Sequence, residues 1–78
     1  MKDRFYLRIG TDTLEEAQGF LTRAAAVREF RIVATELWGF GQSIEASLHR
    51  APDREHVAEY PDWVLSIGPR GGVVVDRA

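Results

Sequence analysis

The stretch that decides the fold is WVLSIGPRGGVVV, residues 63–75. Its two ends, residues 63–67 and 73–75, are rich in β-branched and large apolar side chains, which favour extended strands. The five residues between them hold three glycines and one proline, a composition typical of a turn. The sequence therefore predicts two strands joined by a tight connection, and with them an antiparallel sheet.

The start of the chain carries another strand signal. In residues 4–10, the apolar Phe5, Leu7 and Ile9 alternate with basic or hydroxyl-bearing side chains. Such alternation is typical of a strand with one buried face, and Gly10 marks its end. We therefore predict a half-buried strand at this position.

A helix signal follows. Thr13 and Glu16 have the spacing of a capping box, in which each side chain can bond to the backbone of the other residue. Acidic residues lie near the start and arginines near the end of the next stretch, as the helix dipole favours. The pattern predicts a long helix over residues 13–27. We expect one core, in which four side chains of this segment pack on strand residues: Leu14, Phe20, Leu21 and Val27 on Phe5, Leu7, Ile9 and Ile32.

The middle of the chain is less clear. Residues 30–38 are rich in β-formers and predict a strand, and the glycines in 39–41 predict a turn. Residues 43–50 fit either a strand or a short helix; we favour the strand because a hairpin through the glycine turn is the simpler topology. A helical turn over 53–60, which Pro61 stops, completes the pattern.

Together these segments predict one α+β domain over residues 1–78. The expected architecture is a four- to five-stranded, mostly antiparallel sheet with one long helix packed on one face. The expected order is β-α-β-β-(short α)-β-β. Because the chain has only 78 residues and no cysteine, its core is small and has no disulfide to support it.

Composition excludes several classes of function. The absence of cysteine rules out thiolate metal sites, iron–sulfur clusters and a cysteine nucleophile. A net charge of -2 argues against direct binding of nucleic acid through phosphate attraction, which needs a basic surplus. No apolar run approaches the length of a membrane span, and no signal peptide precedes the first strand. We therefore expect a soluble, cytoplasmic protein without a membrane partner.

No catalytic or metal-binding pattern stands out. His56 and Glu59, with Glu55, have helical spacing, but no third or fourth converging ligand accompanies them and His49 lies elsewhere. The serines lie in no nucleophile motif. We therefore expect no enzyme activity, no catalytic residue, no metal and no cofactor.

Charge is unevenly placed, and this suggests a binding surface. Within residues 53–62, four acidic side chains face a single arginine. An acidic patch beside an aromatic residue could meet a basic groove of a partner protein. The candidate protein-binding residues are Asp53, Glu55, Glu59, Asp62 and Trp63. The alternative binding face consists of Arg4, Tyr6, Arg8 and Arg31, because arginine and tyrosine are favoured interface residues.

Large aromatic side chains occur at expected strand ends and turns. A core of this size can cover only some of these four side chains, which are Trp38, Phe40, Tyr60 and Trp63. Exposed aromatic groups often mark interfaces. We therefore expect a protein partner or a homodimer.

Two resemblances bear on function. The order of elements resembles the RNA recognition motif family, with Gly39-Phe40-Gly41 and Phe5-Tyr6-Leu7 in the places of its two sheet motifs. That resemblance implies a small RNA-binding domain, in which bases stack on sheet aromatics. In size and charge the chain resembles the small anti-CRISPR proteins encoded by phages. This second resemblance implies an inhibitor that binds a CRISPR effector complex in the host cytoplasm and blocks its DNA binding. We take the inhibitor as the expected function and the RNA-binding domain as the alternative.

Overall fold

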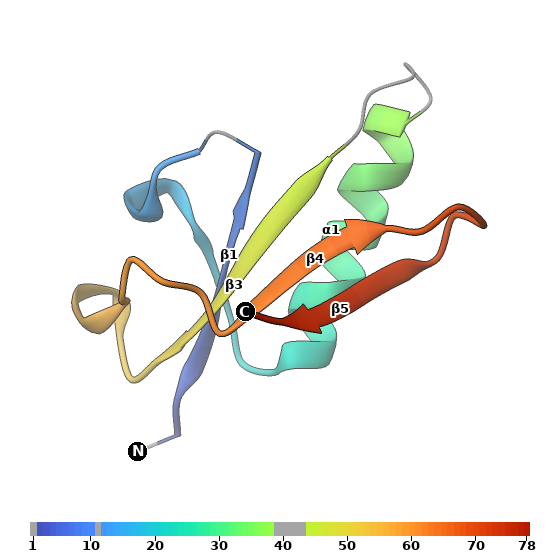
Figure 1. The fold of residues 1–78 in the computed structure, drawn as a ribbon. Helices are drawn as coiled ribbons and strands as arrows, with labels where there is room; N and C mark the ends of the chain where they lie inside the picture. The colour runs from blue at the N-terminus through green and yellow to red at the C-terminus, as the bar shows by residue number, and fades with distance from the viewer. Residues whose placement is uncertain (1, 11, 39–43) are drawn as a thin grey trace.

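The chain folds into one sheet with a long helix beside it (Figure 1). The computed structural model describes residues 2–10, 12–38 and 44–78. Its elements, in chain order, are β1 (Arg4–Ile9), the short 3-10 helix η1 (Leu14–Glu16), β2 (Gln18–Phe20), α1 (Arg23–Trp38), β3 (Glu45–Ala51), the 3-10 helix η2 (Arg54–His56), β4 (Trp63–Ile67) and β5 (Val73–Arg77). Within these ranges, no helix is both long enough and apolar enough to cross a membrane.

The five strands are ordered β2-β1-β3-β4-β5, and every neighbouring pair is antiparallel. The α+β class, with an antiparallel sheet and one long helix on one face, is confirmed. The predicted hairpin is confirmed as β4 and β5, with Ile67 opposite Val73. Gly71 has a φ of 82°, which a residue with a side chain rarely adopts, and the Gly68 N–H donates to the Gly72 carbonyl at 2.8 Å.

The predicted position of the long helix is wrong. Of residues 13–27, only those from Arg23 onward are in α1, and the earlier ones form η1 and β2. The Thr13 hydroxyl donates to the Glu16 carboxylate at 3.0 Å, so the two side chains bond each other instead of capping a long helix. Gly19 in β2 lies opposite Tyr6 of β1, and a glycine is a weak helix former but allows this close approach.

The strand predicted over residues 30–38 is also wrong, because this segment lies in α1. Ala26, Phe30 and Ala34 are four residues apart and fully buried, which is the spacing of one helix face. That packing outweighs the strand preference of the β-branched residues between them. The predicted glycine turn at 39–41 lies outside the described residues. The strand favoured over 43–50 is confirmed as β3.

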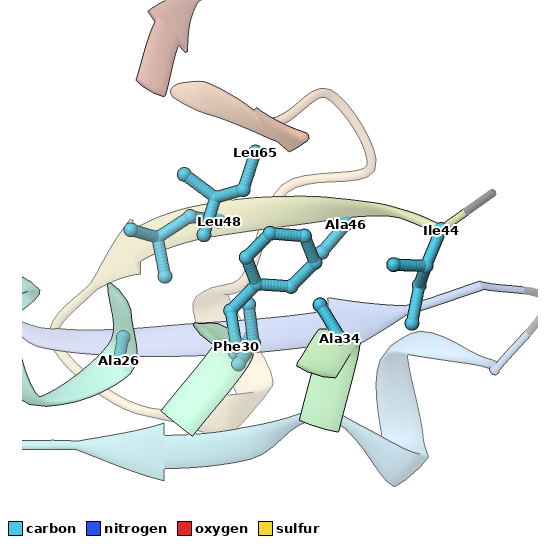
Figure 2. Packing of buried hydrophobic residues seen from close by; sticks show 8 residues of the cluster. Ala26, Phe30, Ala34, Ile44, Ala46, Leu48 and Leu65 are labelled. Carbon is cyan, nitrogen blue, oxygen red and sulfur yellow. The ribbon is translucent and has the colours of Figure 1, made fainter. Parts of the chain in front are cut away.

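The main core lies between α1 and the sheet. Figure 2 shows Ala26, Phe30 and Ala34 of α1 beside Ile44, Ala46, Leu48 and Leu65, and Leu7 completes the buried cluster. Phe5, Ile9, Phe20 and Val27 are partly buried against it, in part as predicted. Three predicted core residues are wrong: the exposed fraction is 71% for Leu21 and 50% for Ile32, and Leu14, in η1, belongs to neither buried cluster. Leu21 precedes the true helix and Ile32 lies on its outer side, because α1 begins at Arg23.

The opposite face of the sheet carries a smaller cluster. Tyr6 and Ala51 are buried there against Ala17, with Val57 packed on them. Ala17 follows η1 and Val57 follows η2, so the two short helices cover this face near β1 and β3. The guanidinium of Arg54 lies over the Tyr6 ring, 5.3 Å from its centroid. Both faces of the central strands are therefore occupied by the chain itself.

Candidate functional site

A broad groove lies between α1 and β5. Its volume is about 1030 Å³. Helix α1 packs across β1, β2 and β4, so β5 extends beyond the helix and leaves this hollow over the sheet edge. The apolar floor consists of Ala24, Val27, Trp63, Val73 and Val75, and the basic residues are Arg23, Arg28, Arg31 and Arg77. We call these nine residues the arginine groove.

The periodicity of the two walls explains how these residues meet. On α1, Ala24, Val27, Arg28 and Arg31 follow the i, i+3, i+4, i+7 spacing of one helix stripe, next to the stripe that faces the core. On β5, alternate residues point to the same side of the sheet. Val75 lies opposite the buried Leu65 in the register, so Val75 and its neighbours at 73 and 77 point toward the helix side.

Trp63 is held at the end of the groove by three neighbours. The guanidinium of Arg23 lies over its ring at 5.3 Å from the centroid, close enough for a cation–π contact. The ring of Phe5 packs at a centroid distance of 5.9 Å with a tilt of 39°, and Arg77 lies directly opposite on β5. Trp63 is half-buried, so it forms a fixed apolar surface between two basic side chains.

The charge in the groove is not neutralised by nearby acids. No acidic residue lines it, and within the described ranges none of its four arginines forms an ion pair. The chain as a whole carries a net charge of -2, so the groove is a positively charged region on a protein whose net charge is negative. A concave surface with one sign of charge attracts ligands of the opposite sign, which here means an anionic group with an apolar part.

The residues of the predicted acidic surface are only partly available. Asp53 caps η2: its carboxylate accepts from the His56 N–H at 3.0 Å and lies 2.7 Å from the His56 ring. The hydrogen bond from His56 holds the pKa of Asp53 below its usual value. Glu55 and Glu59 are exposed. Trp63 belongs to the arginine groove instead, so the structure does not gather all five residues on one surface.

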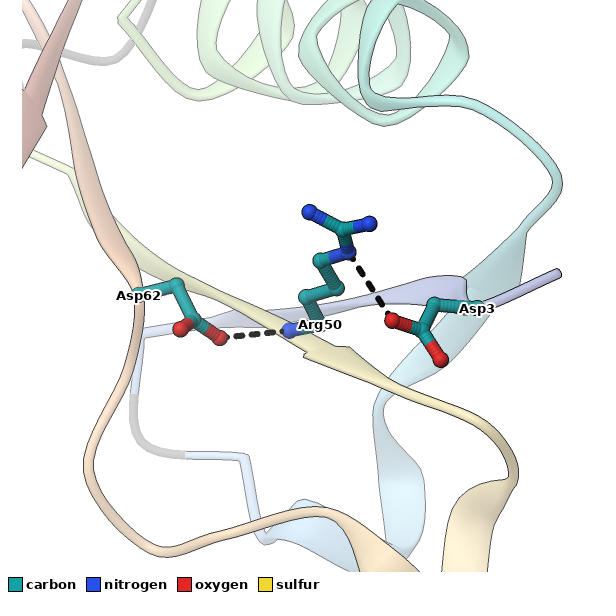
Figure 3. Close-up of polar contacts among 3 residues, drawn as sticks. All are labelled: Asp3, Arg50 and Asp62. Atoms are coloured by element: carbon teal, nitrogen blue, oxygen red, sulfur yellow. Dashed lines mark hydrogen bonds and ion pairs between the residues drawn. The ribbon is translucent and has the colours of Figure 1, made fainter.

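Asp62, the last acidic residue of that segment, binds the neighbouring strand. Its carboxylate accepts from the Arg50 backbone N–H at 2.7 Å, while the Arg50 guanidinium pairs with Asp3 at 3.0 Å (Figure 3). Asp62 therefore fixes the entry of the chain into β4. Partner binding by the segment 53–62 stays a prediction. Because Asp53 and Asp62 are engaged within the chain, the contacts with a partner would be made mainly by the exposed Glu55 and Glu59.

The four residues of the alternative binding face do not share a face. Arg4 is exposed on β1, and Tyr6 is buried beneath Arg54. Arg8 is half-buried and donates to the Ser47 hydroxyl at 3.1 Å. Arg31 lies on α1 and lines the arginine groove. The grouping depended on a strand over 30–38, and that segment is helical.

A buried polar network occupies β3. The exposed fraction of His49 is 1% and that of Ser47 is 9%. His49 Nδ1 lies 2.9 Å from the Ala58 carbonyl, which can only accept, so Nδ1 carries the proton and Nε2 accepts from the Ser47 hydroxyl at 2.9 Å. Burial lowers the pKa of His49, which keeps the ring neutral. The network ties the segment after η2 to the sheet and leaves the His49 ring closed to substrate.

The sequence predictions missed this histidine network and the arginine groove. The signal for the network was the alternation of Ser47 and His49 on a strand, which puts both on one face. The signal for the groove was the helical spacing of Arg28 and Arg31 with Val27, which is visible only once the helix is placed correctly. In the part of the chain that the structure describes, no group of three or more histidine, aspartate or glutamate side chains could hold a metal ion.

Comparisons with known proteins assign no relative. Protein-family models, curated proteins and solved structures gave no match to this chain. The support for a function therefore comes from the geometry and charge of the described residues.

Proposed function

We propose that this chain is a non-enzymatic protein-binding module that holds an acidic segment of a partner protein in the arginine groove. The observation that carries the proposal is the set of four groove arginines without an acidic neighbour. The floor of valines and Trp63 gives the same ligand an apolar surface to bury. Arginine and tryptophan are the residues that contribute most often to binding energy at protein interfaces.

A protein ligand fits this site better than a nucleic acid. Base stacking needs a free aromatic face, and the half-buried Trp63 ring already has Arg23 over it and Phe5 packed against it. Tyr6, the sheet aromatic in the RNA recognition motif resemblance, is buried. The negative net charge of the chain also opposes a long polyanion, whereas a short acidic segment meets only the local field of the groove.

A second binding surface is favoured by one observation: Glu55 and Glu59 are exposed, and within the described ranges their carboxylates form no hydrogen bond or ion pair. They could face a basic groove of a partner, as an inhibitor that imitates nucleic acid would require. Inhibition of a CRISPR effector complex stays a prediction that rests on the resemblance in size and charge. If it is correct, the variant Glu55→Lys with Glu59→Lys loses inhibition while the groove variants below keep it.

The arginine groove is tested with a fluorescein-labelled hexaglutamate peptide and fluorescence anisotropy. We expect Arg28→Glu with Arg31→Glu to weaken binding by about tenfold or more, because two attractive contacts become repulsive. The matched control is Arg4→Glu with Arg70→Glu, which changes the net charge equally at two exposed sites outside the groove.

Two results would overturn the proposal. One is equal loss of affinity in the groove variant and the control, which would mean that only the net charge matters. The other is tighter binding of a labelled oligouridylate with the same dependence on Arg28 and Arg31, which would assign the groove to nucleic acid.

A further inference from the structure

We infer that the partner segment binds as an additional antiparallel β-strand on the outer edge of β5, and that it alternates acidic and apolar residues. This inference rests on the proposed function and adds the shape and sequence pattern of the ligand. β5 is the last strand of the described sheet and has one neighbour, β4. Its other edge therefore presents backbone groups to a ligand, as in binding by strand addition.

The hydrogen bonds of the hairpin identify the free backbone groups. The Gly68 N–H donates to the Gly72 carbonyl, and the Ala78 N–H donates to the Asp62 carbonyl. These two pairs share the register of the β4–β5 ladder, so the even-numbered residues of β5 bond to β4. Hydrogen-bonded and non-bonded pairs alternate in an antiparallel ladder. The N–H and carbonyl groups of Val73, Val75 and Arg77 consequently point away from β4.

The same three residues send their side chains into the arginine groove. In an antiparallel pair, residues directly opposite each other have side chains on the same side of the sheet. Ligand residues opposite Val73, Val75 and Arg77 would thus project toward the helix side, where Arg28 and Arg31 also lie. Acidic side chains at these alternate positions could reach the arginines while their methylene groups cover the valines.

The intervening ligand residues would lie on the other side of the sheet. Their neighbours there are Val74, of which 39% is exposed, and Asp76. Apolar side chains extend the Val74 surface, whereas acidic ones would be repelled by Asp76. This opposition between the two sides predicts the alternating pattern of the ligand.

The charge pattern selects a partner segment over a second copy of this chain. Pairing of β5 with the β5 of another copy would bring two arginine grooves together, and like charges opposite each other are destabilising. The other edge of the sheet is β2, which has only three residues and so offers a shorter template. An acidic segment relieves the repulsion that a second copy would create.

The test compares two labelled octapeptides of equal composition by fluorescence anisotropy. One alternates Glu and Val, and the other has four Glu followed by four Val. We expect the alternating peptide to bind about tenfold more tightly, because only it can combine backbone pairing with acidic side chains opposite Val73, Val75 and Arg77. N-methylation of the Glu amides should abolish this advantage, whereas N-methylation of the Val amides should preserve it. If both N-methylated peptides bind like the parent, or both lose equally, strand addition is contradicted.

A protein variant gives an independent check. Val75→Pro removes one outward N–H without removing a bond to β4, and proline is tolerated at such edge positions. It should reduce the affinity for the alternating peptide to the affinity measured for the peptide with four Glu followed by four Val. The N-methylated peptides decide the question if this variant fails to fold. Binding that depends on Arg28 and Arg31 but not on N-methylation refutes strand addition alone; binding that is independent of both arginines refutes the proposed function.

Discussion

The guanidinium of Arg23 lies over the indole ring of Trp63, 5.3 Å from the ring centroid. Arg23 is the first residue of α1 and Trp63 the first residue of β4, so this contact joins the start of the helix to the sheet. It also places a charged group and an apolar surface side by side at one end of the arginine groove. The contact therefore contributes to both the stability and the shape of the site.

Loss of this contact should be measurable. Arg23→Met keeps the aliphatic stem and removes the charge, so we expect the free energy of unfolding to fall by about 0.5–1 kcal/mol. In a Trp38→Phe background, the emission of Trp63 should shift as well. Arg28→Met is the control, because among the described residues Arg28 has no cation–π contact with an aromatic ring. Equal effects of the two substitutions on stability and emission would contradict the contact.

The core is tested by a pair of helix-side residues. Phe30→Ala should reduce the free energy of unfolding by about 3–5 kcal/mol, since it opens a cavity among fully buried side chains. Leu21→Ala should change it by no more than about 0.5 kcal/mol, because most of that side chain is exposed. Urea denaturation of both variants measures the difference. A larger loss of stability for Leu21→Ala than for Phe30→Ala would contradict the described position of α1.

Stability should depend on pH through His49. Burial lowers its pKa below the usual 6.5, so the unfolded chain binds a proton at a higher pH than the folded chain does. The stabilisation from the neutral ring is complete above pH 6.5 and is lost as the pH falls through the folded pKa. The free energy of unfolding should therefore decrease as the pH falls from 6.5 to the folded pKa of His49.

Two glutamine variants separate the two histidines in this pH experiment. His49→Gln should remove the decrease in stability, and His56→Gln should retain it because His56 is exposed. Chemical denaturation at a series of pH values supplies the measurement. If the decrease disappears in His56→Gln and persists in His49→Gln, His56 causes the pH dependence and the prediction for His49 is contradicted.

Gly19 is expected to be required for the packing of β2 on β1. A Cβ at this position would lie 3.2 Å from Tyr6 Cε1, and the Tyr6 ring is buried. Gly19→Ala should therefore reduce stability by about 1 kcal/mol. Gly72→Ala should be neutral or slightly stabilising, because a Cβ there meets nothing within 4 Å. A comparison of melting temperatures tests this pair, and an unchanged value for Gly19→Ala would argue against the close contact.

Local signals predicted the parts of the fold that depend on local chemistry. The strands at 4–9, 63–67 and 73–77 follow from alternation, β-branched residues and the glycine-rich turn at 68–72. The helix was misplaced because a capping-box spacing at Thr13 and Glu16 competes with a strand-like composition after Phe30. The true helix is selected by tertiary packing of small and aromatic side chains against the sheet, and no local preference reveals that packing.

The candidate site could not be predicted from the sequence for a related reason. Arg28 and Arg31 come from the helix, whereas Trp63 and Arg77 come from the terminal hairpin. They meet only because α1 leaves β5 uncovered, which depends on the strand order and the helix position. The acidic run at 53–62 was visible as composition, but the use of Asp53 and Asp62 in hydrogen bonds could be seen only in the folded chain.

The arginine groove as the binding site is tested most directly by NMR. Nitrogen-15-labelled protein is titrated with hexaglutamate, and the shifts of backbone amides and arginine Nε–H groups are followed. The account predicts that the perturbed residues gather on α1 from Arg23 to Arg31 and on β5 from Val73 to Arg77. Perturbations gathered around Arg4, Arg8 and Arg54, on the other face of the sheet, with the groove unchanged, would contradict it.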